Sequence, residues 1–272
     1  MILTNNDFIL KNDEYLQDGV IFCKNCHTPR MVVLQDFKTR CLCLCQSKKR
    51  DEEFVNKRKA EEFEKIKNLK ASSLMAEKYM TASFDNTDLN RPQSFLNALS
   101  RGKKFCMNWK NVSECGAGMF LYGNKGTGKT YITACIANYL MDRLVPVHMT
   151  NLLEFSKKIR ACYSNDYETE DEVILKFAQV PLLIIDDVSI VKFTKNKEDL
   201  FIQEKFYDLA NYRYIKNLPT LFSSNLSLED LVRENGLSPV TADRISEMCH
   251  AVIKLEGDSY RRKIVQERAP LF

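Results

Sequence analysis

The feature that most constrains the fold is a glycine-rich run that matches every fixed position of a phosphate-binding loop. The run consists of Gly123, Asn124, Lys125, Gly126, Thr127, Gly128, Lys129 and Thr130. Residues 119–122 before it are typical of a buried strand, and residues 131–140 after it are typical of a helix. A strand, this loop and a helix in that order predict an α/β domain that binds a nucleoside triphosphate.

Each residue type in this loop has a physical role. Glycines let the backbone turn so that successive N–H groups point at phosphate oxygens, beside the positive end of the following helix. We expect Lys129 to reach the β- and γ-phosphates and Thr130 to bind magnesium. We also expect Tyr131, directly after the loop, to contribute to nucleotide binding. A chance glycine-rich turn is the alternative, and it leaves the flanking strand and helix unexplained.

A second motif supplies carboxylates. Residues 182–185 are apolar and typical of a buried parallel strand, which ends in Asp186 and Asp187. We expect Asp186 to hold magnesium through water and Asp187 to orient the attacking water. Many related ATPases have Glu at the second position, and Asp is shorter by one methylene. Two solvated loop carboxylates are the alternative, but apolar strands seldom end in paired acids without a counter-charge.

The order of apolar stretches predicts the fold class. The strand candidates are residues 119–122, 145–149, 182–186, 220–224 and 251–255. Helical segments alternate with them, which predicts a three-layer α/β fold with a parallel sheet and ligands at the carboxyl ends of the strands. At 272 residues, the chain has room for one such domain and a small accessory domain. The predicted domains are 1–50, 51–78 and 79–272.

Half of the ten cysteines are clustered near the N-terminus. The clustered residues are Cys23, Cys26, Cys41, Cys43 and Cys45. Such spacing in a reducing compartment favours zinc over disulfides, and four thiolates complete a tetrahedral site. The predicted ligands are Cys23, Cys26, Cys43 and Cys45, with Cys41 as the substitute and His27 as a poorly placed further candidate. Five reduced cysteines in a small apolar fold are the alternative, but so short a segment can hardly bury enough core without a metal.

Residues 51–78 have mixed charges at i, i+4 spacing and predict an exposed helix that joins two domains. A solvated connector is the favoured interpretation. A partner-binding helix is the alternative, supported only by Phe54, Phe63 and Ile66. No uncharged apolar run has the length of a membrane span, so we expect a soluble, cytoplasmic protein without a membrane partner.

The net charge of +4 does not by itself indicate nucleic acid, so any DNA contact must come from a local patch. The candidate patch is a predicted surface loop, residues 191–199. It contains Lys192, Lys195, Lys197 and Phe193. A solvated lysine loop is the slightly favoured alternative. Residues 162–171 are predicted as a second surface loop, and Arg213 is a candidate to face DNA or a neighbouring subunit.

Three further polar residues are candidates for the phosphate site. Asn225 follows the strand at 220–224, where it can hydrogen-bond the γ-phosphate or the attacking water, although a turn-capping role is nearly as plausible. Arg244 and Arg261 are candidates for the cation that stabilises the transferring phosphoryl group. Taken alone, each arginine is more often a surface ion-pair residue.

On these residues the chain resembles the DnaC-like helicase loaders of the AAA+ ATPases, over about residues 79–264. The resemblance rests on residues 79–85, 123–130, 149–151, 184–187, 224–225, 243–245 and 258–261. The cysteine cluster is similar, more loosely, to the zinc-bearing N-terminal domain of loaders from phages and mobile elements of Gram-positive bacteria. The expected fold is therefore an AAA+ P-loop NTPase core behind a small zinc-binding domain and a helical linker.

The resemblance implies a protein that binds the hexameric replicative DNA helicase through its N-terminal domain. It would deliver the helicase to single-stranded DNA under the control of ATP, with Mg²⁺ and Zn²⁺ as cofactors. Lys129 and Thr130 match the Walker A pair. Asp186 and Asp187 match the Walker B pair, and Asn225 matches sensor 1.

The two arginines also match positions of the family. Arg244 matches the arginine finger, which reaches the ATP of a neighbouring subunit, and Arg261 matches the sensor 2 arginine, which acts on its own nucleotide. A finger acting in trans implies self-association in the ATP state and ATP hydrolysis stimulated by assembly and single-stranded DNA. The 11 residues after Arg261 are too few for a full C-terminal lid. We therefore expect an open adenine pocket and modest nucleotide affinity.

A second function stays open. The same AAA+ core occurs in IstB-like ATPases, which assist a transposase in selecting target DNA. Those proteins ordinarily lack a zinc-binding N-terminus, so the cysteine cluster favours the loader. A stand-alone P-loop kinase would need an acceptor pocket and would leave the in-trans arginine unexplained.

Overall fold

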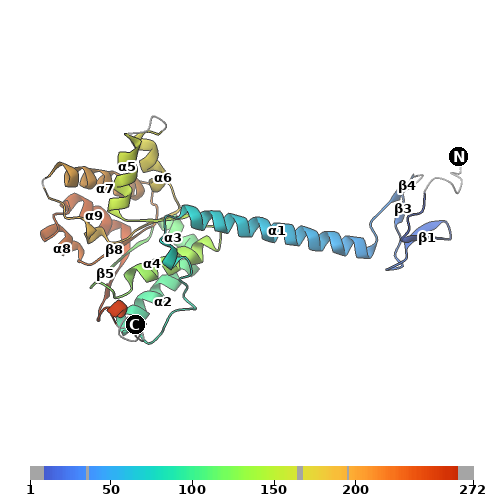
Figure 1. Cartoon of the computed structure of the whole chain (residues 1–272), viewed down its shortest axis with the longest axis horizontal. Coiled ribbons are helices and arrows are strands. Elements are labelled where there is room, and N and C mark those ends of the chain that lie inside the picture. The colour runs from blue at the N-terminus through green and yellow to red at the C-terminus, as the bar shows by residue number, and fades with distance from the viewer. Residues whose placement is uncertain (1–8, 35–36, 164–167, 195, 263–272) are drawn as a thin grey trace, which may run out of the picture. The chain divides into compact units, whose positions relative to one another are not determined.

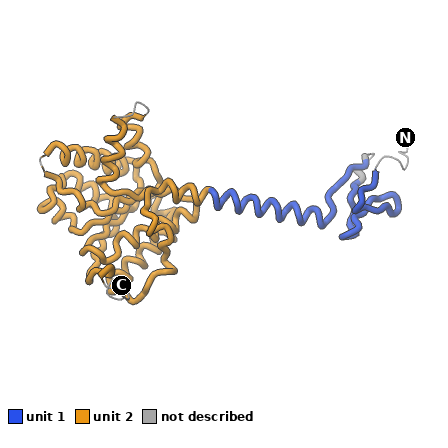
Figure 2. The backbone as a smooth tube through the Cα atoms, viewed as in Figure 1, with its two compact units in different colours: residues 1–64 blue, residues 65–272 orange. Residues whose placement is uncertain are grey.

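The structure is a computed structural model that describes residues 9–34, 37–163, 168–194 and 196–262. It forms two compact units, residues 1–64 and residues 65–272 (Figure 2). Helix α1 (Leu44–Ser72) contributes to both units and has no buried residue. It begins inside the predicted cysteine-rich domain and ends before the predicted boundary at residue 78. The domain limits at residues 50 and 78 stay predictions.

The smaller unit contains two short antiparallel hairpins, β1 with β2 and β3 with β4. Their strands are β1 (Glu14–Gln17), β2 (Val20–Cys23), β3 (Met31–Leu34) and β4 (Phe37–Arg40). Asp18 and Gly19 make the turn of the first hairpin, with φ values of 49° and 73°. Positive φ at both central residues is what a two-residue type I′ turn requires, and Asp-Gly supplies it at low cost.

The larger unit (Figure 1) contains a five-stranded parallel sheet. The strand order is β6-β7-β8-β5-β9. The strands are β5 (Gly118–Gly123), β6 (Val147–Thr150), β7 (Leu182–Ile185), β8 (Thr220–Ser224) and β9 (Cys249–Leu255). They correspond to the five predicted strands. Because β8 lies between β5 and β7, the carboxyl ends of these three strands meet at one edge of the sheet.

Helices connect the strands, as the predicted alternation requires. Those of the larger unit are α2 (Gln93–Met107), α3 (Trp109–Cys115), α4 (Lys129–Met141), α5 (Leu152–Cys162), α6 (Glu170–Ala178), α7 (Lys197–Ile215), α8 (Leu228–Arg233) and α9 (Pro239–Met248), with short 3-10 turns η1 (Glu77–Tyr79) and η2 (Val188–Ile190). Side-chain caps begin several of them. Asn151 caps α5, and Thr169 forms a capping box with Glu172 at the start of α6.

Two apolar cores cover the two faces of the sheet. Met119 and Leu121 of β5 belong to a core with residues of α2 and α4, whereas Phe120 belongs to a core with residues of α5, α6, α7 and α9. Successive strand residues point to opposite faces, so β5 is buried on both sides. The three-layer α/β architecture is confirmed. No helix within the described ranges is long and apolar enough to cross a membrane.

The two predicted surface loops are shorter than expected. Helix α5 extends to Cys162 and α6 begins at Glu170, with residues 164–167 outside the described ranges. Helix α7 begins at Lys197, where Asn196 accepts a hydrogen bond from the backbone N–H of Asp199. Local capping therefore starts these helices inside segments that composition alone marks as loops.

The prediction that Arg213 faces DNA or a neighbouring subunit is wrong. Its side chain is fully buried, and its guanidinium donates to four oxygen atoms. The acceptors are the carbonyls of Ala178, Val180 and Pro219 and the hydroxyl of Thr220, at 2.6–2.8 Å. Burial lowers the pKa of Arg213 to about 9. The residue joins the end of α6 to the start of β8 and is a structural element of the core.

The predicted DNA patch also changes. Phe193 is only 6% exposed and belongs to the core beneath α5 to α7, so it is not available to stack on a base. Its backbone N–H donates to the carbonyl of Asn235, which holds the segment against the turn after α8. Lys197 lies in the first turn of α7, and Lys195 lies outside the described residues.

Candidate functional site

The candidate site is an open pocket of about 790 Å³ at the carboxyl ends of β5, β7 and β8. Parallel α/β sheets place their ligands at this edge. The described residues that line it are Ala76, Lys78, Tyr79, Asn86, Thr87, Asp88, Arg91, Lys125, Gly126, Gly128, Lys129, Thr130, Tyr131, Asp186, Asp187, Ile190, Ser223, Asn225, Tyr260 and Arg261. The structure therefore brings residues from both predicted Walker motifs together with Asn225 and Arg261.

The glycines of the loop allow close packing of the chain. Gly128 has φ of 109°, and a Cβ atom built there would lie 2.5 Å from the ring of Phe95. Gly126 has φ of 85°, and a Cβ atom there would lie 2.2 Å from the hydroxyl oxygen of Ser259. Larger residues at these positions would be strained and would clash. The loop is thus fitted between α2 and the segment that follows β9.

Lys129 is buried at the base of the pocket, with 6% of its surface exposed. Its ammonium donates to the carbonyl oxygens of Gly123 at 2.6 Å and Asn124 at 2.9 Å, and to Oδ1 of Asn225 at 3.0 Å. Burial lowers the pKa of Lys129, and the carboxylates of Asp187 and Asp186 act in the opposite direction. A phosphate group here would place further negative charge beside the buried ammonium and so stabilise its charged form.

Asp186 lies beside Thr130, as the Walker motifs predict. The Thr130 hydroxyl donates to its two carboxylate oxygens at 2.9 and 3.1 Å, and the Ser223 hydroxyl donates to Oδ1 at 2.5 Å. Burial raises the pKa of the Asp186 carboxyl, while these two hydroxyl hydrogen bonds lower it. A desolvated carboxylate next to a hydroxyl is a suitable oxygen donor set for Mg²⁺, which these two side chains would help to hold.

Asp187 is held by a separate set of hydrogen bonds. Its backbone is left-handed, with φ of 51°, and its N–H donates to the Ser223 hydroxyl at 2.9 Å. Its Oδ1 accepts from the Ser189 hydroxyl at 2.6 Å and from Nδ2 of Asn225 at 2.9 Å. Asn225 thus bridges Lys129 and Asp187. Ser189 was not predicted as a site residue, because nothing in its local pattern indicates that its hydroxyl accepts from the backbone N–H of Asn225, which follows β8.

The two predicted arginines occupy different environments. Arg261 lines the pocket, whereas Arg244 on α9 is not among the described residues that do so. The Arg244 guanidinium lies 4.5 Å from the ring centre of Tyr214 and donates to Glu247 at 3.3 Å. Its side chain remains 29% exposed. The chain by itself does not bring Arg244 to the phosphate site.

Several pocket residues come from the segment before β5. The Tyr131 hydroxyl donates to the carbonyl of Ser83 and accepts from Thr87, both at 3.2 Å. Arg91 donates to the carbonyl of Thr127 at 2.9 Å and lies against Tyr260. Sequence reasoning assigned no role to Arg91 or Tyr260, since each is far along the chain from the loop that it contacts.

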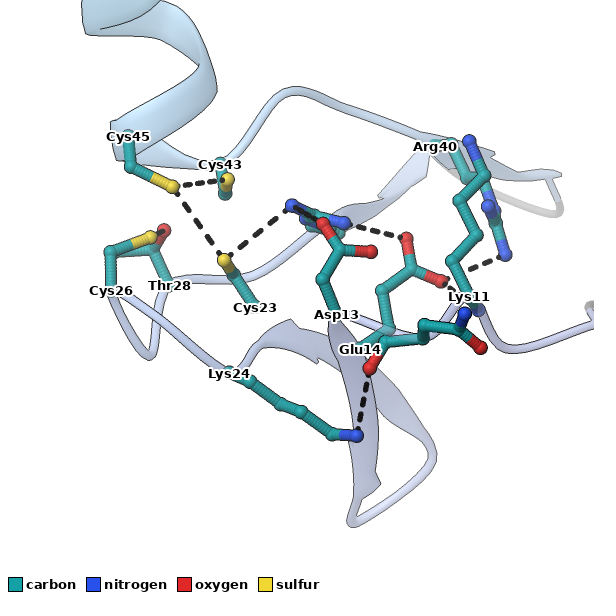
Figure 3. A network of polar contacts seen from close by, with 12 residues as sticks. Lys11, Asp13, Glu14, Cys23, Lys24, Cys26, Thr28, Arg40, Cys43 and Cys45 are labelled. Atoms are coloured by element: carbon teal, nitrogen blue, oxygen red, sulfur yellow. Dashed lines mark hydrogen bonds and ion pairs between the residues drawn. The ribbon is translucent and has the colours of Figure 1, made fainter.

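The smaller unit contains a cluster of four thiols (Figure 3). The sulfur atoms of Cys23, Cys26, Cys43 and Cys45 all lie within 4.8 Å of one another. The Sγ distances are 3.6 Å for Cys23 and Cys45 and 3.2 Å for Cys43 and Cys45. A tetrahedron of thiolates with Zn–S bonds of about 2.3 Å has sulfur atoms about 3.8 Å apart. The positions of these four sulfur atoms therefore fit a zinc site.

The local backbone explains this convergence. The N–H of His27 donates to the carbonyl of Cys23, and His27 is left-handed with φ of 52°, so the chain turns back between Cys23 and Cys26. Cys45 lies in the first turn of α1. Cys41, the predicted substitute, contacts the carbonyl of Pro29 instead, and His27 pairs with Tyr15. Neither belongs to the cluster that the structure describes.

A buried arginine lies directly behind the thiols. Arg30 is 3% exposed, and its Nη2 is 3.5 Å from Sγ of Cys23 and 2.7 Å from Asp13. Its Nη1 is 3.2 Å from Glu14, which also pairs with Arg40 at 3.1 Å. The hydrogen bond from Arg30 holds the pKa of Asp13 below its usual range. This network joins β1 to the cysteine cluster and places positive charge beside the sulfur atoms.

Comparisons with known proteins agree with this geometry. The family model for the IstB-like ATP binding protein matches residues 50–268. The chain is 27% identical over 200 residues to the phage-like element PBSX protein XkdC of Bacillus subtilis, covering 72% of this chain and 73% of that protein. It is also 27% identical over 214 residues to the replicative helicase loader DnaI of the same organism, covering 75% of this chain and 66% of DnaI.

A solved structure of DnaI has a TM-score of 0.54 and 25% identity, covering 68% of this chain and 94% of that chain. The DnaC helicase loader has a TM-score of 0.53 and 22% identity, covering 66% of this chain and all of that chain. The predicted resemblance to DnaC-like loaders and the AAA+ P-loop fold are confirmed. With a family model that matches most of its length, the chain belongs to the IstB-like ATP-binding proteins.

Proposed function

We propose that this protein is an ATP-dependent loader that binds the replicative helicase and delivers it to single-stranded DNA. The observation that carries the proposal is the similarity to two replicative helicase loaders, DnaI and DnaC, over about 70% of the chain. The nucleotide pocket and the four-cysteine cluster support it. The family name alone would equally suit an ATPase that assists a transposase, but the cysteine cluster favours the loader.

In the proposed reaction, Lys129 binds the β- and γ-phosphates of ATP, and the backbone N–H groups of residues 123–130 surround them. Thr130 and Asp186 would hold magnesium, which would neutralise the charge of the phosphates. Asp187 orients the attacking water, and Asn225 fixes the distance between Asp187 and Lys129 through its two hydrogen bonds. Arg261 stabilises the transferring phosphoryl group from within the same subunit.

Arg244 would act on the ATP of a neighbouring subunit. It remains partly exposed on α9 and does not line the pocket of its own chain, which suits a role at a subunit interface. The protein would then self-associate in the ATP state, and single-stranded DNA and the helicase would stimulate hydrolysis by promoting assembly. Turnover strictly proportional to protein concentration would contradict this arrangement.

The four-cysteine cluster would hold zinc and give the smaller unit a fixed surface for the helicase. The four sulfur positions and the positive charge of Arg30 support a thiolate site. Of the three lysines in the predicted DNA patch, Lys192 and Lys197 belong to the described residues, whereas Phe193 of the same patch is buried.

The test is to mix the purified protein with a hexameric bacterial replicative helicase and ATP, and to measure the mass of the complex by light scattering. We expect a complex with the wild-type chain and with Cys41→Ser, a cysteine outside the cluster. The double variant Cys23→Ser, Cys26→Ser should lose the complex. No complex with the helicase, but ATP-dependent filaments on duplex DNA, would instead support the transposition function.

A further inference from the structure

Arg91 occupies an unusual position at the edge of the nucleotide pocket. Its guanidinium carbon lies 4.0 Å from the ring centre of Phe95 and 3.8 Å from the ring centre of Tyr260. Its Nη2 donates to the carbonyl of Thr127 in the phosphate loop at 2.9 Å. Phe95 is fully buried. One planar cation thus contacts a fixed core ring, the loop and an aromatic residue from the far end of the described chain.

The partner residue Tyr260 directly precedes Arg261. The backbone N–H of Tyr260 donates to the carbonyl of Gly126 at 3.0 Å, and its hydroxyl donates to Asp88 at 2.5 Å. A Cβ atom at Gly126 would lie 2.2 Å from the Ser259 hydroxyl, so Gly126 is required for this close approach. Residues 259–261 therefore lie directly on the phosphate loop, with the Arg91 guanidinium stacked on Tyr260.

We propose that Arg91 is a positioning residue for Arg261. By stacking between Phe95 and Tyr260 and bonding to Thr127, it fixes residues 259–261 against the phosphate loop, so that Arg261 faces the γ-phosphate. The inference deepens the proposed function and rests on ATP hydrolysis at this site.

The chemistry of the side chain supports this role. A guanidinium is planar, so it can stack on aromatic residues while its N–H groups donate in the plane. A lysine ammonium keeps the charge but has no plane to stack. Arg91→Lys should therefore behave like Arg91→Ala, and not like the wild type.

Arg91 also lines the pocket, and a direct contact with the nucleotide is the competing explanation. The two explanations differ in what the loss of Arg91 changes. A positioning residue acts through Arg261, so its removal slows hydrolysis and has no further effect once Arg261 is absent. A nucleotide-binding residue would weaken ATP binding whether or not Arg261 is present.

The experiment measures ATP binding and single-turnover hydrolysis with helicase and single-stranded DNA present. The variants are Arg91→Ala, Arg91→Lys, Arg261→Ala and the double variant Arg91→Ala, Arg261→Ala. We expect Arg91→Ala and Arg91→Lys to slow hydrolysis by about 10- to 100-fold, the range for a misplaced catalytic group. Nucleotide affinity should change by less than about 3-fold, and the double variant should be no slower than Arg261→Ala.

Three further variants guard against an effect on folding. Tyr260→Leu removes the stack from the other side and should reproduce Arg91→Ala, whereas Tyr260→Phe keeps the ring, loses the hydrogen bond to Asp88 and should slow hydrolysis less than Tyr260→Leu does. Arg143→Ala is the matched control, because Arg143 stacks on Tyr139 at 3.5 Å and donates to its carbonyl, at the end of α4. It should hydrolyse ATP at the wild-type rate.

Additive losses in the double variant, or weaker ATP binding with an unchanged rate, would overturn the positioning role. If the wild-type protein hydrolyses ATP and Arg91→Ala hydrolyses it at the same rate, this inference is overturned and the proposed function stands. A wild-type protein that neither binds nor hydrolyses ATP under these conditions would overturn the proposed function, and the inference with it.

Discussion

The cysteine cluster and the nucleotide pocket each hold several ionisable groups close together, but they differ in the size of the apolar core beside them. The pocket lies at the edge of a sheet whose two faces are covered by two apolar cores. In the described part of the smaller unit, the buried apolar side chains ahead of α1 are Ile21, Cys23, Met31 and Cys43. Glu14 and Arg30 are buried among them.

This difference has a physical consequence. So small an apolar core contributes little to folding, since below about 40 residues a metal or disulfides are usually needed. The smaller unit would therefore depend on the proposed zinc ion and on its ion pairs. The larger unit depends on its two apolar cores for stability. It can therefore tolerate polar groups that destabilise the fold at the carboxyl edge of its sheet.

Metal removal should give the largest effect. If the cluster holds zinc, its chelation would remove about 10–16 kcal/mol of apparent binding free energy, the range for structural zinc sites. We expect residues 9–34 and 37–43 to lose their protection from hydrogen exchange, while strands β5 to β9 keep theirs and the protein still binds ATP.

Hydrogen exchange measured by mass spectrometry, with and without chelator, checks this difference. Cys41→Ser serves as the control, because Cys41 lies outside the cluster and its variant should stay protected in the presence of zinc. Equal loss of protection in both units would show that they do not fold independently.

The next effect concerns the core of the larger unit. Arg213→Met should lower the free energy of unfolding by about 3–5 kcal/mol, because four oxygen atoms lose their buried donor. Chemical denaturation measures the loss. Arg160→Met, which removes a partly exposed ion pair with Glu198, should cost less than about 1 kcal/mol. Zinc affinity should be the same in both variants, since neither side chain belongs to the smaller unit.

Arg30→Gln should change the metal affinity of the smaller unit and leave the larger unit unaffected. Removing a buried partner of the sulfur atoms should weaken zinc binding by about 10- to 100-fold, the usual cost of losing an outer-shell partner. Competition with a coloured chelator gives the affinity. Arg40→Gln is the control, because Arg40 also pairs with Glu14 but its side chain is 29% exposed. An equal loss in both variants would assign the effect to the ion pairs of Glu14 and not to the contact with Cys23.

The sequence predicts the central residues of both regions. Both centres are encoded by short spacings, so the phosphate loop, Asp186, Asp187 and the four cysteines could be identified before the fold was known. The five strands follow from short apolar runs. Local patterns carry this information because each motif is made by neighbouring residues.

What the sequence does not predict depends on contacts between distant segments. Arg91 and Tyr260 are 169 residues apart in the sequence. They become neighbours only because the segment after β9 packs on the phosphate loop. Arg213 was a candidate to face DNA or a neighbouring subunit, and its four acceptors become visible only when α6, α7 and β8 are assembled. Phe193 was misplaced for the same reason, since the turn after α8 that covers it lies far along the chain.

The smallest predicted effect tests whether the larger unit carries a destabilising group for its function. Burial raises the pKa of Asp186 above its usual value, so the folded state binds the proton more tightly than the unfolded state. The ionised carboxylate therefore destabilises the fold at neutral pH, and this cost disappears as the pH falls below the raised pKa. Without nucleotide and magnesium, Asp186→Asn should be more stable than the wild type at pH 7, by about 0.5–2 kcal/mol.

The gain should shrink as the medium is made more acidic, because protonation of Asp186 gives the wild type a neutral group as well. Thermal unfolding at several pH values measures it. Asp85→Asn is the matched control, since the Asp85 side chain is 87% exposed and should show no such gain. A variant that is less stable at pH 7 would mean that the hydroxyls of Thr130 and Ser223 stabilise the carboxylate more than burial destabilises it. The edge of the large sheet would then be as well compensated as the cysteine cluster, and the contrast between the two regions would not hold.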